Sequence, residues 1–304
     1  MLRIIQNRKI FFVAAGILVG LSLAASLVWG LKPGLDFTGG SLMEIEFSGG
    51  RPAADEVAAA ARKSAGTEEL FVQALGDSGL VLRMPSLDES AHQALLADLK
   101  KTFETEEGAK IDEKRFESIG PLIGAELRKK TMYAVVGAIL AIVLYITYAF
   151  RQISYPVASW KYGVCTIVAL AHDVAIPTGV FAVLGRYLDV EVGAWMVTAL
   201  LTILGFSVHD TIVVFDRIRE RLSYRARESF EETVNRSVNE TLARSINTSL
   251  TVLLVLFAAY FFGGESIKNF VLTLIIGITA GTYSSIFVAS PLLVAWHARS
   301  SKKR

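Results

Sequence analysis

Residues 132–150 read MYAVVGAILAIVLYITYAF, a run of 19 residues without a charged side chain. A helix of about 20 apolar residues is long enough to cross the hydrocarbon core of a bilayer. Because backbone polar groups cannot stay unpaired in lipid, such a run is predicted to form a helix. Similar runs occupy residues 10–31, 162–185, 193–215, 246–263 and 269–296. The sequence therefore predicts a multi-span α-helical membrane protein with six transmembrane helices.

The composition of the 304-residue chain supports this class, since 52% of the residues are hydrophobic and only 20% are charged. Such a chain is too apolar to be a soluble globular protein or a disordered one. Its net charge of +2 gives no global excess of one sign, so no nucleic-acid partner is expected. The single cysteine, Cys165, lies inside an apolar run, which excludes an intrachain disulfide and a Cys-based metal site.

The positions of Lys and Arg predict the orientation in the membrane. The flanks assigned to the cytoplasm carry 16 of these residues, whereas the two short outer loops carry only Arg186 and Lys268. The first apolar run is longer than the core of a secretory signal, about 7–15 residues, so we expect it to remain as a span. The expected segments are a cytoplasmic N-terminus with the first helix (1–31), an extracytoplasmic domain (32–130) and a five-helix region (131–304) with a cytoplasmic loop (217–244) and a cytoplasmic C-terminus.

The extracytoplasmic segment switches between periods that are typical of strands and of helices. Strands are predicted at 41–47, 70–75, 80–84 and 115–119, and helices at 54–65 and 88–103. The order βαββαβ predicts one small α+β ferredoxin-like domain of two layers. The glycine-rich stretch 34–40, just before this domain, lacks the Lys-Ser/Thr ending of a phosphate-binding loop and is predicted to be a tight turn.

Two aspartates at membrane depth are the sharpest functional signals. Asp173 lies near the middle of the third run, and Asp210 lies about 10 Å from the inner end of the fourth, at 1.5 Å per residue. A charged carboxylate at a helix centre costs about 2.5–3.5 kcal/mol on insertion scales, so it usually faces a partner or a water-filled cavity. Since the short side chain of Asp210 cannot reach the headgroups, we interpret it as functional.

Arg244, at the entrance of the fifth run, has two interpretations. Its polar face could meet that of Asp210 across the two helices, which would form an Asp–Arg pair. Alternatively, Glu240 could pair with Arg244 from four residues earlier while the arginine stem extends to the headgroups. The polar residues that share these faces with Asp210 and Arg244 are Ser207, Asn247 and Thr248.

His172 and His209 each precede one of the aspartates and are secondary candidates for a proton or polar network. No metal-ligand spacing joins them, and no nucleophile-plus-base or nucleotide-binding motif is visible. Asp216 and Arg217, at the membrane boundary, are predicted to form an interfacial ion pair. We therefore expect no metal, no cofactor and no enzymatic activity.

Five motifs, in this order, resemble those of the SecF subunits of bacterial protein translocase, which belong to the SecD/SecF family within the RND transporter superfamily. They are long, specific and spread over nearly the whole chain. The motifs are 34–40 GLDFTGG, 120–127 GPLIGAEL, 171–173 AHD, 210–220 DTIVVFDRIRE and 239–249 NETLARSINTS. The chain departs from the family pattern at His209, where an uncharged polar residue such as Asn is expected.

The resemblance implies a subunit of the bacterial inner membrane that pairs with its paralogue SecD and associates with the SecYEG channel. Such a complex uses the proton-motive force to assist the export and release of unfolded secreted polypeptides. The residues that the family uses for ion coupling correspond to Asp210 and Arg244. The coupling ion, H⁺ or Na⁺, and the residues that touch the polypeptide stay open at this point.

Two other functions are compatible with the same spans. An RND-like small-molecule exporter would be expected to have duplicated outer domains and a large apolar pocket, and only one small outer domain is predicted here. A purely structural assembly subunit would tolerate neutralisation of Asp210 and Arg244 together. Export measured with and without an ionophore distinguishes these functions from ion-coupled translocation.

Overall fold

The computed structural model describes residues 1–104, 110–150, 157–224 and 228–301. The chain divides into two compact units, a helical unit of Met1–Lys32 and Tyr133–Arg304 and an α+β unit of Pro33–Met132. Part of the predicted loop 217–244, and the last residues of the predicted cytoplasmic C-terminus, lie outside the described residues.

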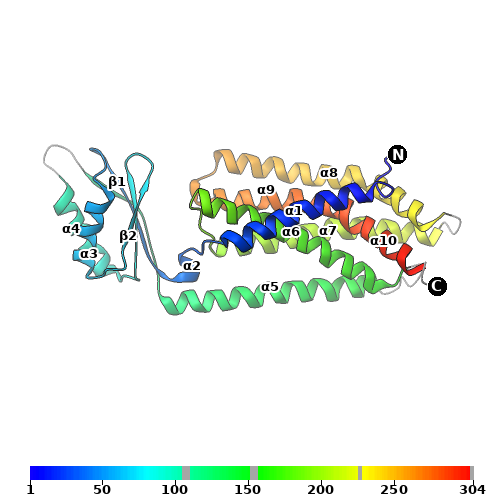
Figure 1. The fold of residues 1–304 in the computed structure, drawn as a ribbon, viewed down its shortest axis with the longest axis horizontal. Helices are drawn as coiled ribbons and strands as arrows, with labels where there is room; N and C mark the ends of the chain where they lie inside the picture. Colours follow the sequence, from blue (N-terminus) through cyan, green and yellow to red (C-terminus); the bar gives the residue numbers. More distant parts are fainter. Residues whose placement is uncertain (105–109, 151–156, 225–227, 302–304) are drawn as a thin grey trace. The chain divides into compact units, whose positions relative to one another are not determined.

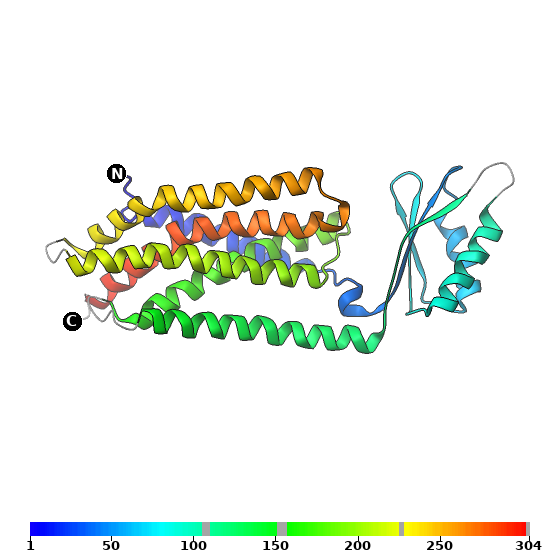
Figure 2. The same ribbon diagram turned by 180° about the vertical axis from the view of Figure 1, so that it is seen from behind.

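Six helical segments of the described chain are long and apolar enough to cross a membrane, which confirms the predicted six-span architecture. Figures 1 and 2 show these helices running alongside one another as a bundle. The last segment is α-helical at both ends and has one π-helical stretch, η1, in between. The segments are α1 (Arg8–Trp29), α5 (Pro121–Ala149), α6 (Ser159–Tyr187), α7 (Ala194–Tyr224), α8 (Phe230–Phe262) and the series α9 (Glu265–Ser284), η1 (Ser285–Ala289) and α10 (Ser290–Ser301).

Several helices extend well beyond the apolar runs that predicted them. Helix α5 begins at Pro121, and the first helical position suits proline because no backbone N–H is needed there. Helix α8 begins at Phe230, where Ser229 and Glu232 form a capping box that satisfies free N–H groups. An apolar run therefore marks only the part of a helix that fits the hydrocarbon core. The charged turns beyond it remain helical.

The apolar stripe on the first turns of α8 packs inside the helical unit. Val234 and Val238 are fully buried in one cluster with Ile5, Phe215 and Ile218. The structure places this stripe against the end of α7 and the N-terminal residues of the chain.

Small residues allow the membrane helices to approach closely. A Cβ atom added to Gly179 on α6 would lie 2.4 Å from the Cα atom of Ser22 on α1. A Cβ atom on Gly277 of α9 would lie 2.1 Å from the Cδ1 atom of Ile203 on α7. Since lipid tails are as apolar as the helices, this close packing is a main source of helix association in a membrane.

The α+β unit has the predicted order βαββαβ. Its four strands form an antiparallel sheet in the order β2-β3-β1-β4. Two helices cover one face of the sheet, and the core between them contains Met43, Ile45, Leu82, Leu95 and Leu99. The elements are β1 (Gly40–Phe47), α3 (Ala54–Ala65), β2 (Phe71–Leu75), β3 (Gly79–Met84), α4 (Glu89–Phe103) and β4 (Ile111–Ile119). The fold is therefore that of a multi-span helical membrane protein with a small α+β domain.

The two glycine motifs at the ends of this unit lie against each other. The first is not a simple turn, because it contains the short helix α2 (Leu35–Thr38), which ends at Gly39 with a left-handed φ of 71°. A Cβ atom on Gly124 of α5 would lie 3.0 Å from the backbone nitrogen of Gly39. The entry and the exit of the unit are thus packed backbone to backbone, which explains why both motifs need glycine.

Candidate ion-coupling site

Asp210 is a buried carboxyl group, and only one of its two oxygens accepts a hydrogen bond from a described residue. It lies on α7 and is 5% exposed. The Ser245 hydroxyl on α8 donates a hydrogen bond of 2.6 Å to Oδ1. The other oxygen, Oδ2, is buried and has no hydrogen-bond partner among the described residues. A charged carboxylate with one unfilled oxygen is costly at this depth, so the group is suited to take up a proton or a cation.

Arg244 does not pair with Asp210 in this structure, so the expected Asp–Arg pair is not formed. Its guanidinium makes no hydrogen bond or ion pair with a described residue. The reason lies in helix geometry, because adjacent residues on an α-helix point about 100° apart. Ser245 points at Asp210 and is buried, so its neighbour Arg244 points elsewhere and is exposed on the surface of the chain.

The alternative partner of Arg244, Glu240, is also engaged elsewhere. Arg217 on α7 contacts its Oε2 atom through Nε and Nη2, each at 2.6 Å. Arg221 contacts its Oε1 atom through Nη1 at 2.5 Å. The predicted ion pair between Asp216 and Arg217 is wrong, because the Arg217 side chain pairs with Glu240 on α8 instead. Asp216 instead lies 3.7 Å from Arg219, one turn further along its own helix.

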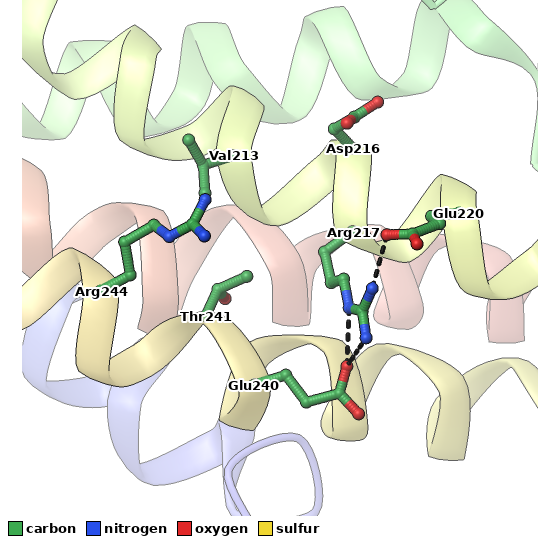
Figure 3. A pocket seen from close by; sticks show the side chains of 7 residues that line it. All are labelled: Val213, Asp216, Arg217, Glu220, Glu240, Thr241 and Arg244. Atoms are coloured by element: carbon green, nitrogen blue, oxygen red, sulfur yellow. Dashed lines mark hydrogen bonds and ion pairs between the residues drawn. The ribbon is translucent and has the colours of Figure 1, made fainter.

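A polar pocket of about 310 Å³ lies between the ends of α7 and α8. It is lined by Val213, Asp216, Arg217, Glu220, Glu240, Thr241 and Arg244. Figure 3 shows the Arg244 side chain reaching from α8 toward Val213, while Arg217 is held by Glu220 and Glu240. The pocket therefore gives the guanidinium of Arg244 room to move on the side of Asp210 that the sequence predicts to be cytoplasmic.

Asp173 is the centre of a second buried cluster, and its carboxylate is well satisfied. It is 0% exposed and accepts hydrogen bonds at Oδ2 from Ser207 on α7, at 2.5 Å, and from Ser284 on α9, at 2.8 Å. The His172 Nδ1 atom lies 2.9 Å from Oδ1. The His172 ring is stacked on Tyr283, with 5.9 Å between the ring centroids. Of the expected secondary residues, Asp173, His172 and Ser207 are therefore brought together.

The remaining secondary candidates form no hydrogen bond with either carboxyl group among the contacts of the described residues. His209 is exposed on α7, and Asn247 and Thr248 are exposed on α8. They share a helix with Asp210 or Arg244 but not a buried face. Their place on the surface of the chain is that of groups facing lipid, water or another subunit.

Hydroxyl residues that the sequence did not single out complete the site. The hydroxyls of Thr211 and Ser285 are hydrogen-bonded at 2.8 Å, and Ser285 donates a further bond of 3.3 Å to the Ser207 carbonyl. Ser285 begins η1, and π-helical turns occur frequently at functional sites. The available signal was the occurrence of serine and threonine inside apolar runs, which is too common to identify single residues. Through Ser207 and Thr211, α7 connects the two aspartates.

The family profile described as "Protein export membrane protein SecD/SecF, C-terminal" matches residues 98–299, and that of the SecD/SecF GG motif matches residues 28–50. The protein translocase subunit SecF of Thermobaculum terrenum is 44% identical over 306 residues, which cover 97% of this chain and 94% of that protein. SecF of Desulfurispirillum indicum is 40% identical over 94% of this chain and 88% of its own length.

The crystal structure of SecDF from Thermus thermophilus, titled a translocon-associated membrane protein, superposes with a TM-score of 0.77 at 34% sequence identity. A second SecDF structure, in a super-membrane-facing form, gives a TM-score of 0.69 at 33% identity. Each match covers 99% of this chain, which spans only 38% and 39% of the respective SecDF chains. On the sequence motifs, the six spans and these matches, the chain belongs to the SecD/SecF family of protein export membrane proteins.

Proposed function

We propose that this chain is the translocase subunit through which an ion gradient, the proton-motive force, drives protein export. It would act without a cofactor and without catalysing a chemical reaction. The burial of Asp210 in a membrane helix carries the proposal, because its Oδ2 atom has no hydrogen-bond partner among the described residues. One turn further along α7, at Val213, a pocket contains Arg244, which is not paired with any described residue. A carboxyl group in this setting is the kind of group that exchanges a proton across part of a membrane.

The proposed step is the neutralisation of Asp210. Charged Asp210 attracts Arg244 and accepts the Ser245 hydrogen bond, and protonated Asp210 loses the attraction, so that α7 and α8 repack. A proton moving through 100 mV releases about 2.3 kcal/mol. Interhelical hydrogen bonds in membrane proteins are worth about 0.6 kcal/mol on average and at most about 1.7. The gradient is therefore large enough to rearrange contacts of this size, and the repacking would move the α+β unit that holds emerging polypeptide.

The partners and the location belong to the same proposal. The solved relatives are SecDF chains, in which this chain matches 38% of the length, and this supports SecD as the partner. The description of SecDF as translocon-associated supports a place beside SecYEG, with unfolded secreted polypeptide as the substrate. The distribution of Lys and Arg favours the bacterial inner membrane with both termini in the cytoplasm and the α+β unit outside.

The test is the variant Asp210→Asn, assayed in inverted membrane vesicles together with SecD and SecYEG. We expect normal membrane insertion and SecD association. Because the variant can no longer use the gradient to stimulate export, an ionophore should not reduce its export further. The matched control is Glu231→Gln, which removes a carboxylate on the same bundle end, where Glu231 pairs with Arg8 at 3.2 Å.

Three outcomes contradict the proposal, and two of them favour another function. Undiminished, ionophore-sensitive export by Asp210→Asn contradicts coupling through this carboxyl group. Export insensitive to an ionophore in the unaltered protein favours a structural subunit. Gradient-dependent efflux of a small molecule, without an effect on polypeptide export, favours an exporter.

A further inference from the structure

We infer that Arg217 is a positioning residue that, with Arg221, occupies the Glu240 carboxylate and so keeps Arg244 available to Asp210. The inference rests on the proposed function, since it concerns the same arginine. It gives a role to the ion pairs of Arg217 and Arg221 with Glu240, which take no direct part in the proposed coupling step.

The register of α7 against α8 places Arg244 between two carboxylates. Asp210 is bonded to Ser245, and Arg217, seven residues after Asp210, is bonded to Glu240. The helices are therefore antiparallel neighbours here, and both contacts lie within about 10 Å along α7 at 1.5 Å per residue. Arg244 stands between these two levels and lines the pocket with Val213. Along the axis of α8, the level of Asp210 therefore lies on one side of Arg244 and Glu240 lies on the other.

Glu240 is the natural competitor for Arg244. A glutamate four residues before an arginine on one helix is in the favourable order for an intrahelical ion pair. Glu240 lies at the charged end of the bundle and does not need the gradient to become charged. Pairing with it would hold Arg244 in one place whether Asp210 is charged or protonated. A switch that depends on Asp210 therefore requires Glu240 to be occupied.

The structure shows this occupation in detail. Each carboxylate oxygen of Glu240 has its own arginine: Arg217 binds Oε2 through two nitrogen atoms at 2.6 Å, and Arg221 binds Oε1 at 2.5 Å. Charge-assisted bonds of this kind are the strongest hydrogen bonds that side chains form. Arg221 is 9% exposed and so is held in place by packing as well. Arg244, in contrast, has no partner among the described residues.

Removal of Arg217 should leave the fold intact. Its second contact, Glu220 at 2.5 Å, is on the same helix and has a side chain that is 53% exposed, so water replaces the lost partner. Arg221 keeps a contact with Glu228 at 3.5 Å. The matched control is Arg219→Gln, which removes the same charge two residues further along α7. Arg219 contacts Asp216 and not Glu240.

The experiment measures gradient-stimulated export for Arg217→Gln with Glu240 present and in a Glu240→Gln background. We expect at least a fivefold loss when Glu240 is present and less than a twofold loss in the Glu240→Gln background. Arg219→Gln should lose less than twofold in either background. Amounts of chain in the membrane and of copurified SecD are measured for every variant, and export is normalised to them.

The remaining outcomes overturn the inference. Arg217→Gln with unaltered export shows that Arg244 needs no protection. An equal loss in both backgrounds shows that Arg217 acts by itself. A Glu240→Gln chain without stimulated export shows that Glu240 is required and is not a competitor. Failure of the proposed function is recognised separately, because Asp210→Asn then keeps its stimulation whatever Arg217→Gln does.

Discussion

Replacement of Asp173 by alanine should destabilise the helical unit by about 1–3 kcal/mol. The change removes the acceptor of the Ser207 and Ser284 hydroxyls. A buried donor without a partner costs about 1–3 kcal/mol in soluble proteins, which would give as much as about 6 kcal/mol for two. The lower range applies here because the Gly281 carbonyl lies 3.1 Å from the Ser284 hydroxyl, which can donate its proton there when Asp173 is absent. Interhelical hydrogen bonds in membranes are also weaker, about 0.6–1.7 kcal/mol each.

The free energy of unfolding can be measured by SDS titration of the purified protein in mixed micelles. Ser207→Ala should cost about half as much as Asp173→Ala, because one of the two interhelical bonds remains. Thr202→Val is the control, since its hydroxyl is exposed and bonds the Thr198 carbonyl of its own helix. An Asp173→Ala protein as stable as Thr202→Val would refute the assignment of Asp173 as a structural link between α6, α7 and α9.

Gly179→Ala should destabilise the protein by about 1–3 kcal/mol, because its Cβ would overlap the backbone of Ser22. Gly137→Ala, which has no atom within 4 Å of its Cβ, should be neutral or stabilising in the same SDS titration; equal effects would contradict the close α1–α6 packing. The Ala91 N–H bond lowers the pKa of Asp88, so this N-cap of α4 stabilises above the ordinary carboxyl pKa of about 3.9 and is lost as the pH falls through the lowered value. Asp88→Asn should reduce the acid-induced loss of amide protection in α4, measured relative to the intrinsic exchange rate at each pH, and an unchanged pH profile of protection would contradict this role of the carboxylate.

The helices and strands that were predicted best are those whose own residues show the periodicity and the end charges typical of the element. Helix α3 matches its predicted range, because alanines and end charges specify it locally. Strand β4 begins at Ile111, four residues before the predicted start, because the exposed charged residues of an edge strand hide its alternation. The helix ends beyond the spans were missed for a similar reason. An apolar run indicates which part of a helix lies in the hydrocarbon core, whereas a capping residue such as Ser229 indicates where the helix begins.

The burial of the two membrane carboxyl groups was predictable, but their partners were not. A charge inside an apolar run is costly wherever the helix points, so Asp173 and Asp210 stand out without a structure. Whether a neighbouring helix offers Arg244 or Ser245 depends on the rotation of α8, and one residue changes that direction by about 100°. The sequence contains no measure of this rotation. The same limit explains why Glu240 was interpreted within its own helix, when its arginine partners come from α7.

The two aspartates differ in how firmly they are held, and the proposed ion coupling needs both kinds of site. Asp173 accepts bonds from two other helices, and a Cβ atom on Gly281 would lie 3.6 Å from its Oδ2 atom, so nothing there can move freely. Asp210 has one bond and an unfilled oxygen one turn away from Ser207. If α7 is fixed at the first level, the proposed change of charge at the second would act on α8 and on Arg244, which lines the pocket. In the proposed mechanism, a rigid link one turn from an adjustable one would let the loss of a single charge move a helix in a defined direction.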